Sequence, residues 1–596
     1  MMTSNVKNAF LAFGLIALVL IFTPRYLKWL SPQPEVPPQQ TGEILPDGAF
    51  ERSIMEPRGL AAPVAPTQAS KRSQETLPVP QWEERVVTIE TPLYRAEVSS
   101  RGGGHLQTFE LKEYQSGQVN GPVQLIPPAL NDVTLRISYI NLDGDSVYLV
   151  DNFEVMEAPR TEVVQLPEGE ISLRYRYTFD SGASVTKRIT FQADSYTMPI
   201  EISWHLPELE IGPSALEYEV SWPLGLLPAE KKVKEDETYG MVYVYQGGEL
   251  EDQGTAGNES VKREVFKGNT NWVAQRNKYF TAALIADPDH PGVYGAYSAE
   301  AVPIRADGNG PETLTRYHMA IGYQAGQTVA MTVYLGPLSY FIIKDLEVDL
   351  ERIMNFGFAL IRPISKFVLY SLVFLHDYIP NYGVVLILFA LAVRIVTNPL
   401  TKKSSYSTQK MQMVQPQVKE LQAKYKGNPQ KLNKEMMALW KAEGVNPLGG
   451  CLPILIQMPL LWALFIVFRT TIELRGAPFA LWITDLSAPD VIFTLPFSIP
   501  LYGDGVTVLA LVMGVTMFVQ QKLSGAASNP QQKPMMYMMT GMFFLIFNQF
   551  PSGLNLYYAF SNILAIVQQR RIHKSLMLSQ PSPAPKKGPK KAKLAT

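Results

Sequence analysis

One arginine lies inside the long apolar stretches in the second half of the chain, where a charge is costly. Arg394 follows Gly383 by eleven residues, with no charged residue between them. On an insertion scale, an arginine at the centre of a membrane helix costs about 2.5–3.5 kcal/mol. Two interpretations are open: the side chain extends to the nearer lipid headgroups, or it faces a hydrated cavity. We favour the cavity because polar residues elsewhere in the chain could also face it.

A polar stripe follows one face of the last apolar stretch. Its members have helical spacings of three, four and seven residues: Asn555, Tyr558, Asn562 and Gln569. Gln457 is a lone amide in an earlier apolar stretch. These groups could simply hydrogen-bond between helices. No Asp or Glu within the apolar stretches could neutralise Arg394, however, so we expect water there and hence a wet groove.

Groups for covalent catalysis are missing from the same stretches. All six histidines lie outside them, so Ser552-Gly553 has no intramembrane base for serine protease chemistry. The chain has no Gly-Lys pair for a phosphate-binding loop. Its one cysteine, Cys451, can form neither an intramolecular disulfide nor a cysteine cluster for a metal. We therefore expect no enzyme activity, no cofactor and no metal site.

Apolar segments long enough to cross a membrane must position the polar residues. Within residues 382–571, five such segments predict a five-helix core: 382–399, 448–468, 505–521, 534–550 and 552–569. A further apolar run, Ala9 to Phe22, has no small-residue cleavage site after it. We interpret residues 1–30 as an uncleaved signal anchor, with a cleaved signal peptide as the alternative. The expected total is six spans.

The first half of the chain predicts a large antiparallel β-sandwich over residues 81–340, preceded by a linker. Residues 31–80 contain ten prolines, which is typical of an extended linker. Polar and apolar residues then alternate, as in 172–179, where a turn at Asp180-Ser181-Gly182 leads to a second strand. Another predicted strand, 331–335, should stop at Gly336-Pro337. Residues 341–381 mix aromatic and charged side chains, which favours interfacial helices.

A lysine-rich segment, 401–446, separates the first two spans of the core. It holds nine lysines and three glutamates, a net charge of +6. Apolar residues recur at heptad spacing on both sides of Gly427-Asn428-Pro429: Met411, Val414, Val418 and Leu421, then Leu432 and Met436. This pattern predicts an antiparallel helical hairpin, in which Pro416 could kink the first helix.

The distribution of lysine predicts the orientation of the chain. The hairpin and the basic tail, 572–596, should stay in the cytoplasm. Six spans then put both termini inside and the sandwich outside, in the periplasm of a bacterial inner membrane. The basic surface suits RNA phosphates, so the ribosome or signal-recognition components are expected partners. The alternative is that these lysines only enforce topology or contact anionic lipid.

Several motifs together resemble those of the YidC insertases. Residues 435–459 read EMMALWKAEGVNPLGGCLPILIQMP. Three further motifs occur in the same order and at similar spacing as in that family: NPLTK at 398–402, LRGAPF at 474–479 and FPSGLNLYY at 550–558. The resemblance covers about 360–571. The β region is similar, more loosely, to the periplasmic domain of Gram-negative members, with SRGGG at 100–104. The fold expected is mixed: a polytopic α-helical membrane bundle with a large all-β sandwich.

This resemblance implies a membrane protein insertase and chaperone for nascent membrane proteins in the lipid bilayer, working alone or with the Sec translocon. It implies a hydrophilic groove that is open to cytoplasm and lipid, with Arg394 as its positive residue. Met458 and Tyr558 would meet substrate, and the sandwich would have the sugar-binding supersandwich fold. The chain departs from the family by a longer segment between Trp482 and Val506, which obscures the start of the fourth span.

Two other functions are compatible with parts of the sequence. A small-solute transporter or channel would need a through-pathway, and usually a second ionisable site or broken-helix repeats. Neither is evident. An exported carbohydrate-binding domain on a membrane anchor would leave the hairpin and the polar groove unexplained.

Overall fold

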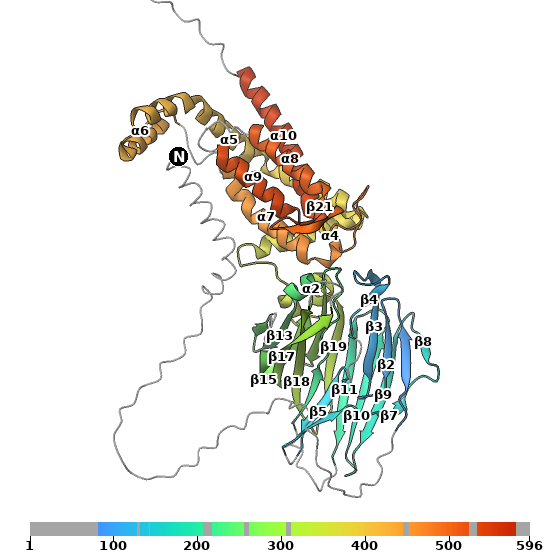
Figure 1. The fold of residues 1–596 in the computed structure, drawn as a ribbon. Coiled ribbons are helices and arrows are strands. Elements are labelled where there is room, and N and C mark those ends of the chain that lie inside the picture. The colour runs from blue at the N-terminus through green and yellow to red at the C-terminus, as the bar shows by residue number, and fades with distance from the viewer. Residues whose placement is uncertain are drawn as a thin grey trace, which may run out of the picture.

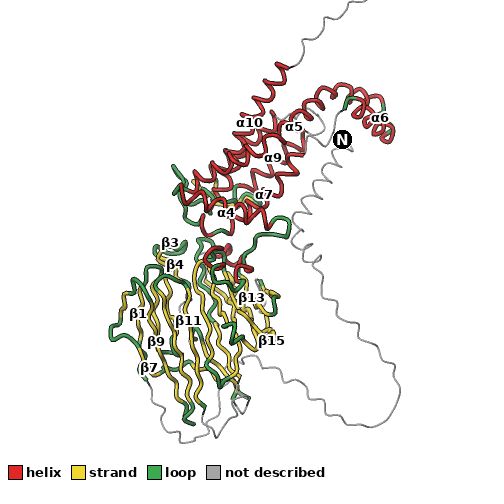
Figure 2. Tube along the Cα trace, turned by 180° about the vertical axis from the view of Figure 1, so that it is seen from behind, coloured by secondary structure: helices red, strands yellow, loops and turns green. Residues whose placement is uncertain are grey.

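The computed structural model describes residues 82–127, 132–141, 144–206, 217–254, 261–305, 311–444, 452–523 and 533–579. The expected anchor, the linker and the last part of the basic tail lie outside these ranges. The described chain forms a large β-domain and, beyond it, a bundle of helices from the second half of the sequence (Figure 1). Seen from behind, the strands and the helices remain separate, and the hairpin ending in α6 lies far from the strands (Figure 2). This combination confirms the predicted mixed fold.

A five-stranded sheet forms one part of the β-domain, in the order β4-β3-β2-β1-β8. Its strands are β1 Val86–Glu90, β2 Tyr94–Ser99, β3 His105–Gln115, β4 Pro122–Gln124 and β8 Val163–Gln165. Strands β1 and β8 pair in parallel, whereas β1–β2, β2–β3 and β3–β4 are antiparallel.

A fourteen-stranded sheet forms the rest of the domain, in the order β6-β5-β12-β18-β17-β15-β16-β19-β11-β10-β9-β7, with β13 and β14 attached through β15. Its bounds are β5 Arg136–Ile140, β6 Ser146–Leu149, β7 Glu154–Glu157, β9 Glu170–Thr178, β10 Ser184–Gln192, β11 Thr197–His205, β12 Glu217–Trp222, β13 Met241–Gln246, β14 Glu249–Gln253, β15 Val261–Arg276, β16 Phe280–Ala286, β17 Gly292–Arg305, β18 Pro311–Gln324 and β19 Val329–Pro337. One short helix, α2 Val233–Tyr239, lies between β12 and β13.

The alternating residues of 172–191 form the antiparallel pair β9–β10, as predicted. Val185 lies opposite Tyr177, and Ile189 lies opposite Leu173. The turn between the strands includes Gly182, whose φ of +84° favours glycine. Along β10 every second side chain is buried, so the period of two in the sequence is the period of contact with the core.

Strand β19 runs further than predicted. It includes Gly336 and Pro337, which pair with Thr281 and Phe280 of β16. The expectation that the strand stops before them was wrong, because the pairing reaches the end of the strand, where a proline is tolerated. A Cβ on Gly336 would lie only 2.8 Å from the Tyr196 ring, so glycine allows this close packing.

The SRGGG segment packs over a buried lysine. Lys187 of β10 is fully buried, and its Nζ donates to the carbonyl oxygens of Leu135 at 2.7 Å and Gly102 at 3.4 Å. Burial lowers the Lys187 pKa to about 7. Gly104 has a φ of +101°, and a Cβ there would lie 2.3 Å from Ile189 Cδ1. The glycines therefore allow the chain to cross close to the core.

Short helices lead from the sandwich to the bundle: α3 Tyr340–Lys344, the 3-10 turn η1 Leu350–Ile353 and α4 Arg362–Tyr378. The bundle then contains α5 Tyr382–Lys424, α6 Pro429–Ala442, α7 Leu452–Thr470, the turn η3 Ile472–Leu474, the strands β20 Val491–Ile499 and β21 Gly503–Thr507, and the helices α8 Val508–Leu523, α9 Lys533–Phe547 and α10 Ser552–Ser579. Buried apolar residues continue without a break from the strands through α3 and η1 into α4, α5 and α7.

Among the described helices, one segment is both long and apolar enough to cross a membrane, namely Tyr382–Ser404 of α5. Three shorter apolar helices accompany it: Gln457–Thr470, Val508–Leu523 and Tyr537–Phe547. The predicted span 505–521 starts later than expected, because residues up to Thr507 belong to strand β21. Helix α8 begins where the Asp490 carboxylate accepts hydrogen bonds from the Val508 and Leu509 amides, at 3.1 and 2.9 Å.

Candidate functional site: a polar seam in the helical bundle

Arg394 lies on α5, with its side chain partly buried in the bundle. Its Nε is buried, and among the described residues it has no hydrogen-bond partner. The neighbouring Ile395 and Val396 are largely exposed, as expected of side chains that face lipid. Thr397 bonds to the Val393 carbonyl of its own helix, at 2.8 Å. Arg394 therefore turns inward while the next residues turn outward.

Helix α10 packs between α5 and α8 and presents a polar face to each. Toward α5, the Gln568 amide donates to Asn398 Oδ1. The ring of Tyr557 lies 6.2 Å from the ring of Phe389 on α5, measured between centroids. The sequence analysis missed Tyr557, Gln568 and Asn398. Asn398 and Tyr557 belong to two of the family-like motifs, which was the one available signal.

The predicted stripe faces the other side, toward α8 and α9. Asn555 is fully buried, and its Nδ2 donates to the Phe547 carbonyl at 3.1 Å. The Tyr558 ring packs edge-on against Phe547 at 5.8 Å, and the Asn562 amide donates to Thr516 Oγ1 at 3.4 Å. Arg394 therefore lies on the α5 side of α10, and the stripe lies on its α8 and α9 side. We call these polar residues together the polar seam.

Several polar atoms in this seam are buried without a partner. Within the described part of the chain, these are Arg394 Nε, Asn555 Oδ1, Tyr557 OH, Tyr558 OH, Gln568 Oε1 and Gln569 Oε1. An unpaired buried polar atom costs about 1–3 kcal/mol. Six such atoms lie along two adjacent helices, where bridging water would supply the missing hydrogen bonds.

Gln457 and Met458 are both exposed near the hairpin end of α7. No contact links them to the face that carries Arg394 among the contacts of the described residues. Their predicted place in the same groove stays a prediction.

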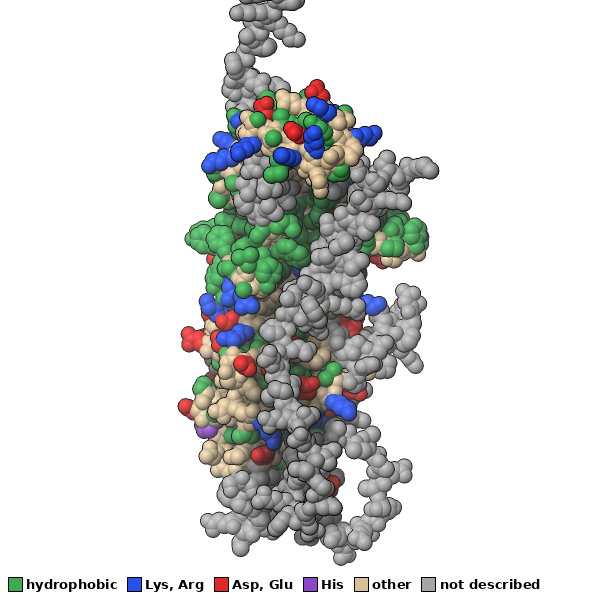
Figure 3. Space-filling model, turned by 90° about the vertical axis from the view of Figure 1, so that its left-hand side faces the viewer, with side chains coloured by type: hydrophobic (Ala, Val, Ile, Leu, Met, Phe, Trp, Pro, Cys, Tyr) green, Lys and Arg blue, Asp and Glu red, His purple; other side chains and the backbone are tan. Residues whose placement is uncertain are grey.

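The cytoplasmic hairpin has a small core of its own. Val414 and Val418 are buried, and Met411, Met436 and Leu439 pack against them. Leu421 and Leu432 are half-buried nearer the turn. Helix α5 continues through Pro416, and the Asn428 side chain caps α6 by accepting from the Lys431 amide at 3.1 Å. Lysines gather at this end of the molecule, beyond a band of hydrophobic side chains on the helical part (Figure 3).

The opposite end of the bundle, next to the sandwich, is closed by the loop 475–490. Ser552 Oγ donates to the Asp485 carbonyl at 2.6 Å, and the Gly553 amide donates to the Leu486 carbonyl at 2.9 Å. At the start of α5, a Cβ on Gly383 would lie 2.0 Å from the Phe479 ring. Residues of both family-like motifs, LRGAPF and FPSG, therefore pack together at this end of the bundle.

An ion pair crosses from this loop to the sandwich. Arg475 Nε lies 2.6 Å from Glu230 Oε1, and the two side chains are only 8% and 16% exposed. The Arg475 guanidinium also lies over the Phe280 ring, 5.3 Å from its centroid. Nearby, Ser339 Oγ donates to Glu473 Oε1 at 3.0 Å, and burial raises the pKa of that carboxyl.

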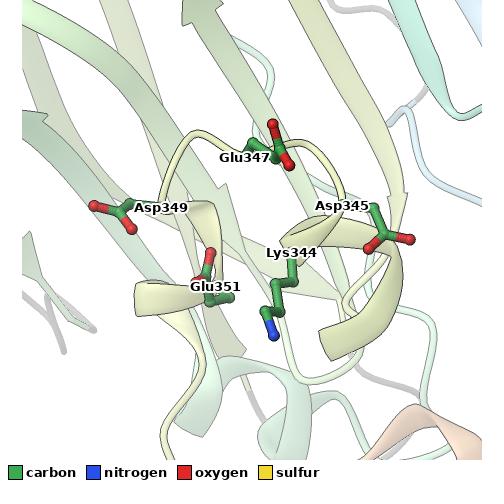
Figure 4. Close-up of a pocket in the computed structure, with 5 residues that line it drawn as sticks. All are labelled: Lys344, Asp345, Glu347, Asp349 and Glu351. Carbon is green, nitrogen blue, oxygen red and sulfur yellow. The ribbon is translucent and has the colours of Figure 1, made fainter.

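A second cluster of charges lies on the sandwich side of α4. Lys344, Asp345, Glu347, Asp349 and Glu351 line a pocket, where the carboxylates of Asp345 and Asp349 point away from each other (Figure 4). Asp349 accepts from the Tyr245 hydroxyl at 2.8 Å. In the described ranges, no group of three or more His, Cys, Asp or Glu is arranged to hold a metal ion.

Taken together, the fold and the seam define a helical membrane protein that also has a large β-domain. Residues 86–370 match the family described as the YidC periplasmic domain, and residues 374–579 match the family described as the 60Kd inner membrane protein. The chain belongs to the YidC family of membrane protein insertases. It is thus an inner-membrane protein with a periplasmic domain, and its substrates are membrane proteins.

Curated relatives cover almost the whole chain. The membrane protein insertase YidC of Chloroherpeton thalassium is 34% identical over 580 residues, 96% of each chain. That of Chlorobaculum parvum is also 34% identical, over 98% of this chain and 99% of its own. Among solved structures, the active YidC insertase with its first transmembrane domain resolved is 19% identical and covers 81% of this chain and 94% of that chain, with a TM-score of 0.34. The relatives are named insertases, in agreement with the expectation of no covalent catalysis.

Proposed function

We propose that the polar seam around α10 is the groove through which this insertase moves the polar end of a client into the bilayer. The observation that supports this best is the set of unpartnered buried atoms on α5 and α10. A client's polar groups could replace water at these atoms as they pass. Arg394 would attract an acidic segment, because its charge has no acidic partner within the bundle's apolar stretches.

The energy of insertion can come from the client itself. About twenty leucine-like residues, at about −0.5 kcal/mol each, gain roughly 10 kcal/mol on entering the bilayer. The barrier is the polar flank that must cross first. A seam that is hydrated from the hairpin end and sealed by loop 475–490 at the other would shorten that crossing.

Site-specific photo-crosslinking tests the groove. A crosslinker at Tyr558 or Gln568 should capture a ribosome-bound nascent chain with one transmembrane segment. The matched control is Val396, which is 77% exposed on α5 and should capture lipid instead. Equal capture of the nascent chain at Val396 and at both seam positions would contradict a groove at α10.

For the orientation, we infer that both termini are cytoplasmic, as the +6 hairpin supports. An engineered cysteine at Gly427, in a chain whose Cys451 is replaced by serine, should react with an impermeant reagent only after the inner membrane is opened. Labelling from the periplasmic side would contradict this topology.

For the partners, we propose that the hairpin and basic tail contact the ribosome or signal-recognition components, and that insertion can also proceed beside the Sec translocon. The +6 hairpin and the basic tail support contact with the ribosome or signal-recognition components. Only the resemblance supports insertion beside the Sec translocon. Binding to ribosomes should weaken steeply as salt rises. A chain that ends at Gln580 should bind less. Binding that is insensitive to both changes would exclude RNA contact by the tail.

A further inference from the structure

The β20–β21 ribbon, residues 491–507, exposes an unusual number of large apolar side chains. Ile492 and Phe493 are 59% exposed, and Phe497 and Leu501 are 60% exposed. No Asp, Glu, Lys or Arg lies between Val491 and Gly503. Almost every residue of β20 is exposed, so neither of its faces packs on a core. One set of alternate residues is wholly apolar, namely Val491, Phe493, Leu495, Phe497 and Ile499, whereas the other set includes Thr494 and Ser498. In water such an edge is a site of aggregation.

Strand β21 and the turn before it are fixed to the segment that follows α9. Buried Asn548 accepts from Thr507 Oγ1 at 2.8 Å, and its amide donates to the Tyr502 carbonyl at 2.8 Å. The Tyr502 ring lies 5.8 Å from the Phe544 ring. These contacts set the depth of the ribbon relative to the adjacent helices.

The adjacent helix α8 is too short to cross the hydrocarbon layer alone. Its 16 residues span about 24 Å at 1.5 Å per residue, against a hydrocarbon thickness of about 30 Å. Its apolar part is shorter still, because Gln520, Gln521 and Lys522 occupy the end away from the ribbon. The missing apolar length therefore falls at the start of α8, where the ribbon lies.

We propose that the β20–β21 ribbon is embedded in the lipid of the outer leaflet, at the boundary between headgroups and acyl chains. The neighbouring surface indicates that lipid covers the ribbon, because the exposed side chains of Leu511, Val512 and Val515 continue its apolar surface along α8. A deeper position is disfavoured, because a two-stranded ribbon leaves edge N–H and C=O groups unpaired. Pro496 and Pro500 remove two of those donors, which suits a shallow position in the membrane.

Spin-label accessibility tests this position. In a Cys451→Ser background, Phe497→Cys carries a nitroxide label, and the full chain is placed at one copy per nanodisc of phosphatidylethanolamine and phosphatidylglycerol. Collisions with oxygen, which partitions into lipid, are compared with those of a water-soluble nickel chelate. Val396→Cys on α5 serves as the lipid control, and Val163→Cys, 51% exposed on strand β8 of the sandwich, serves as the water control.

The label at Phe497 should favour oxygen over nickel, as at Val396 but at a shallower depth. Phe493→Cys should give the same result, so the conclusion does not depend on one variant. Nickel accessibility equal to that at Val163 would place the ribbon in water. Exclusion of both reagents would place it against protein. Either result would overturn the proposal.

Discussion

The ion pair between Glu230 and Arg475 links the sandwich to the helical bundle across 245 residues of sequence. Arg475→Met keeps most of the side chain's length and leaves the nearly buried Glu230 carboxylate without its partner. Removing one partner of a buried pair costs about 3–5 kcal/mol. Because both side chains retain slight exposure, we expect the lower end, about 3 kcal/mol, or roughly a hundredfold in the equilibrium constant for opening the junction.

Hydrogen exchange of the full chain in detergent measures this opening. Two amides report on the two sides: Gly117, which donates to the Ala229 carbonyl at 2.8 Å, and Ala477, which donates to the Leu474 carbonyl at 3.3 Å. Both should exchange roughly a hundredfold faster in Arg475→Met. The control is Arg188→Met, which breaks a pair 35% and 54% exposed and should cost less than about 1 kcal/mol.

A double variant separates the pair from its two residues. Glu230→Leu combined with Arg475→Met leaves no unpaired charge, so it should exchange more slowly than the sum of the single effects predicts. Simple additivity would refute the reasoning. So would an effect of Arg475→Met on Gly117 no larger than that of Arg188→Met.

Three further changes test the fold. Burial lowers the Lys187 pKa to about 7 from the ordinary 10.5, so between these pH values the unfolded state binds more protons than the folded state. The free energy of unfolding should therefore rise with pH in this range, by up to about 1.4 kcal/mol per pH unit. The urea midpoint should be higher at pH 9 than at pH 7 in the wild type but not in Lys187→Met, and an equal rise in both would contradict this account. Asp490→Ala should lower the free energy of unfolding by about 1–2 kcal/mol, because α8 loses its N-terminal cap, whereas Asp490→Asn should keep most of that stability. Thermal midpoints in detergent measure the difference, and equal decreases in the two variants would exclude capping. Gly104→Ala should destabilise by about 1–3 kcal/mol in the same assay through its clash with Ile189, and an unchanged midpoint would contradict that packing.

Local patterns in the sequence predicted the regular elements well. Alternation predicted β9 and β10, because their buried residues recur every second position. Heptad spacing predicted the hairpin, whose core forms around Val414 and Val418. In both cases the period in the sequence is the period of contact in the structure, so no knowledge of distant residues was needed.

Contacts between distant residues could not be predicted in the same way. The pairing of Glu230 with Arg475 depends on how the sandwich packs against the bundle, and no local repeat in the sequence indicates that packing. The stripe at Asn555, Tyr558 and Asn562 was predicted from helical spacing, but the direction it faces depends on the neighbours of α10. The β20–β21 ribbon was missed because Pro496 and Pro500 interrupt the segment, and proline within a short run argues against a strand.

The role of Arg394 is tested most directly by insertion into proteoliposomes. The client has one transmembrane segment and a translocated tail that is either acidic or neutral, and insertion is scored by protection of the tail from protease. The variants are Arg394→Lys and Arg394→Met, with exposed Arg570→Met on α10 as the matched control.

With Arg394→Met, insertion of the acidic-tailed client should fall about tenfold, as expected if the wet seam leaves about 1.4 kcal/mol of charge attraction. The neutral-tailed client should change little. Arg394→Lys and Arg570→Met should leave both clients near wild type, because the seam needs positive charge more than the guanidinium shape. Equal loss with Lys and Met would mean that specific hydrogen bonding is required. Undiminished insertion of the acidic-tailed client by Arg394→Met would contradict a charged groove and would place the arginine among the lipid headgroups.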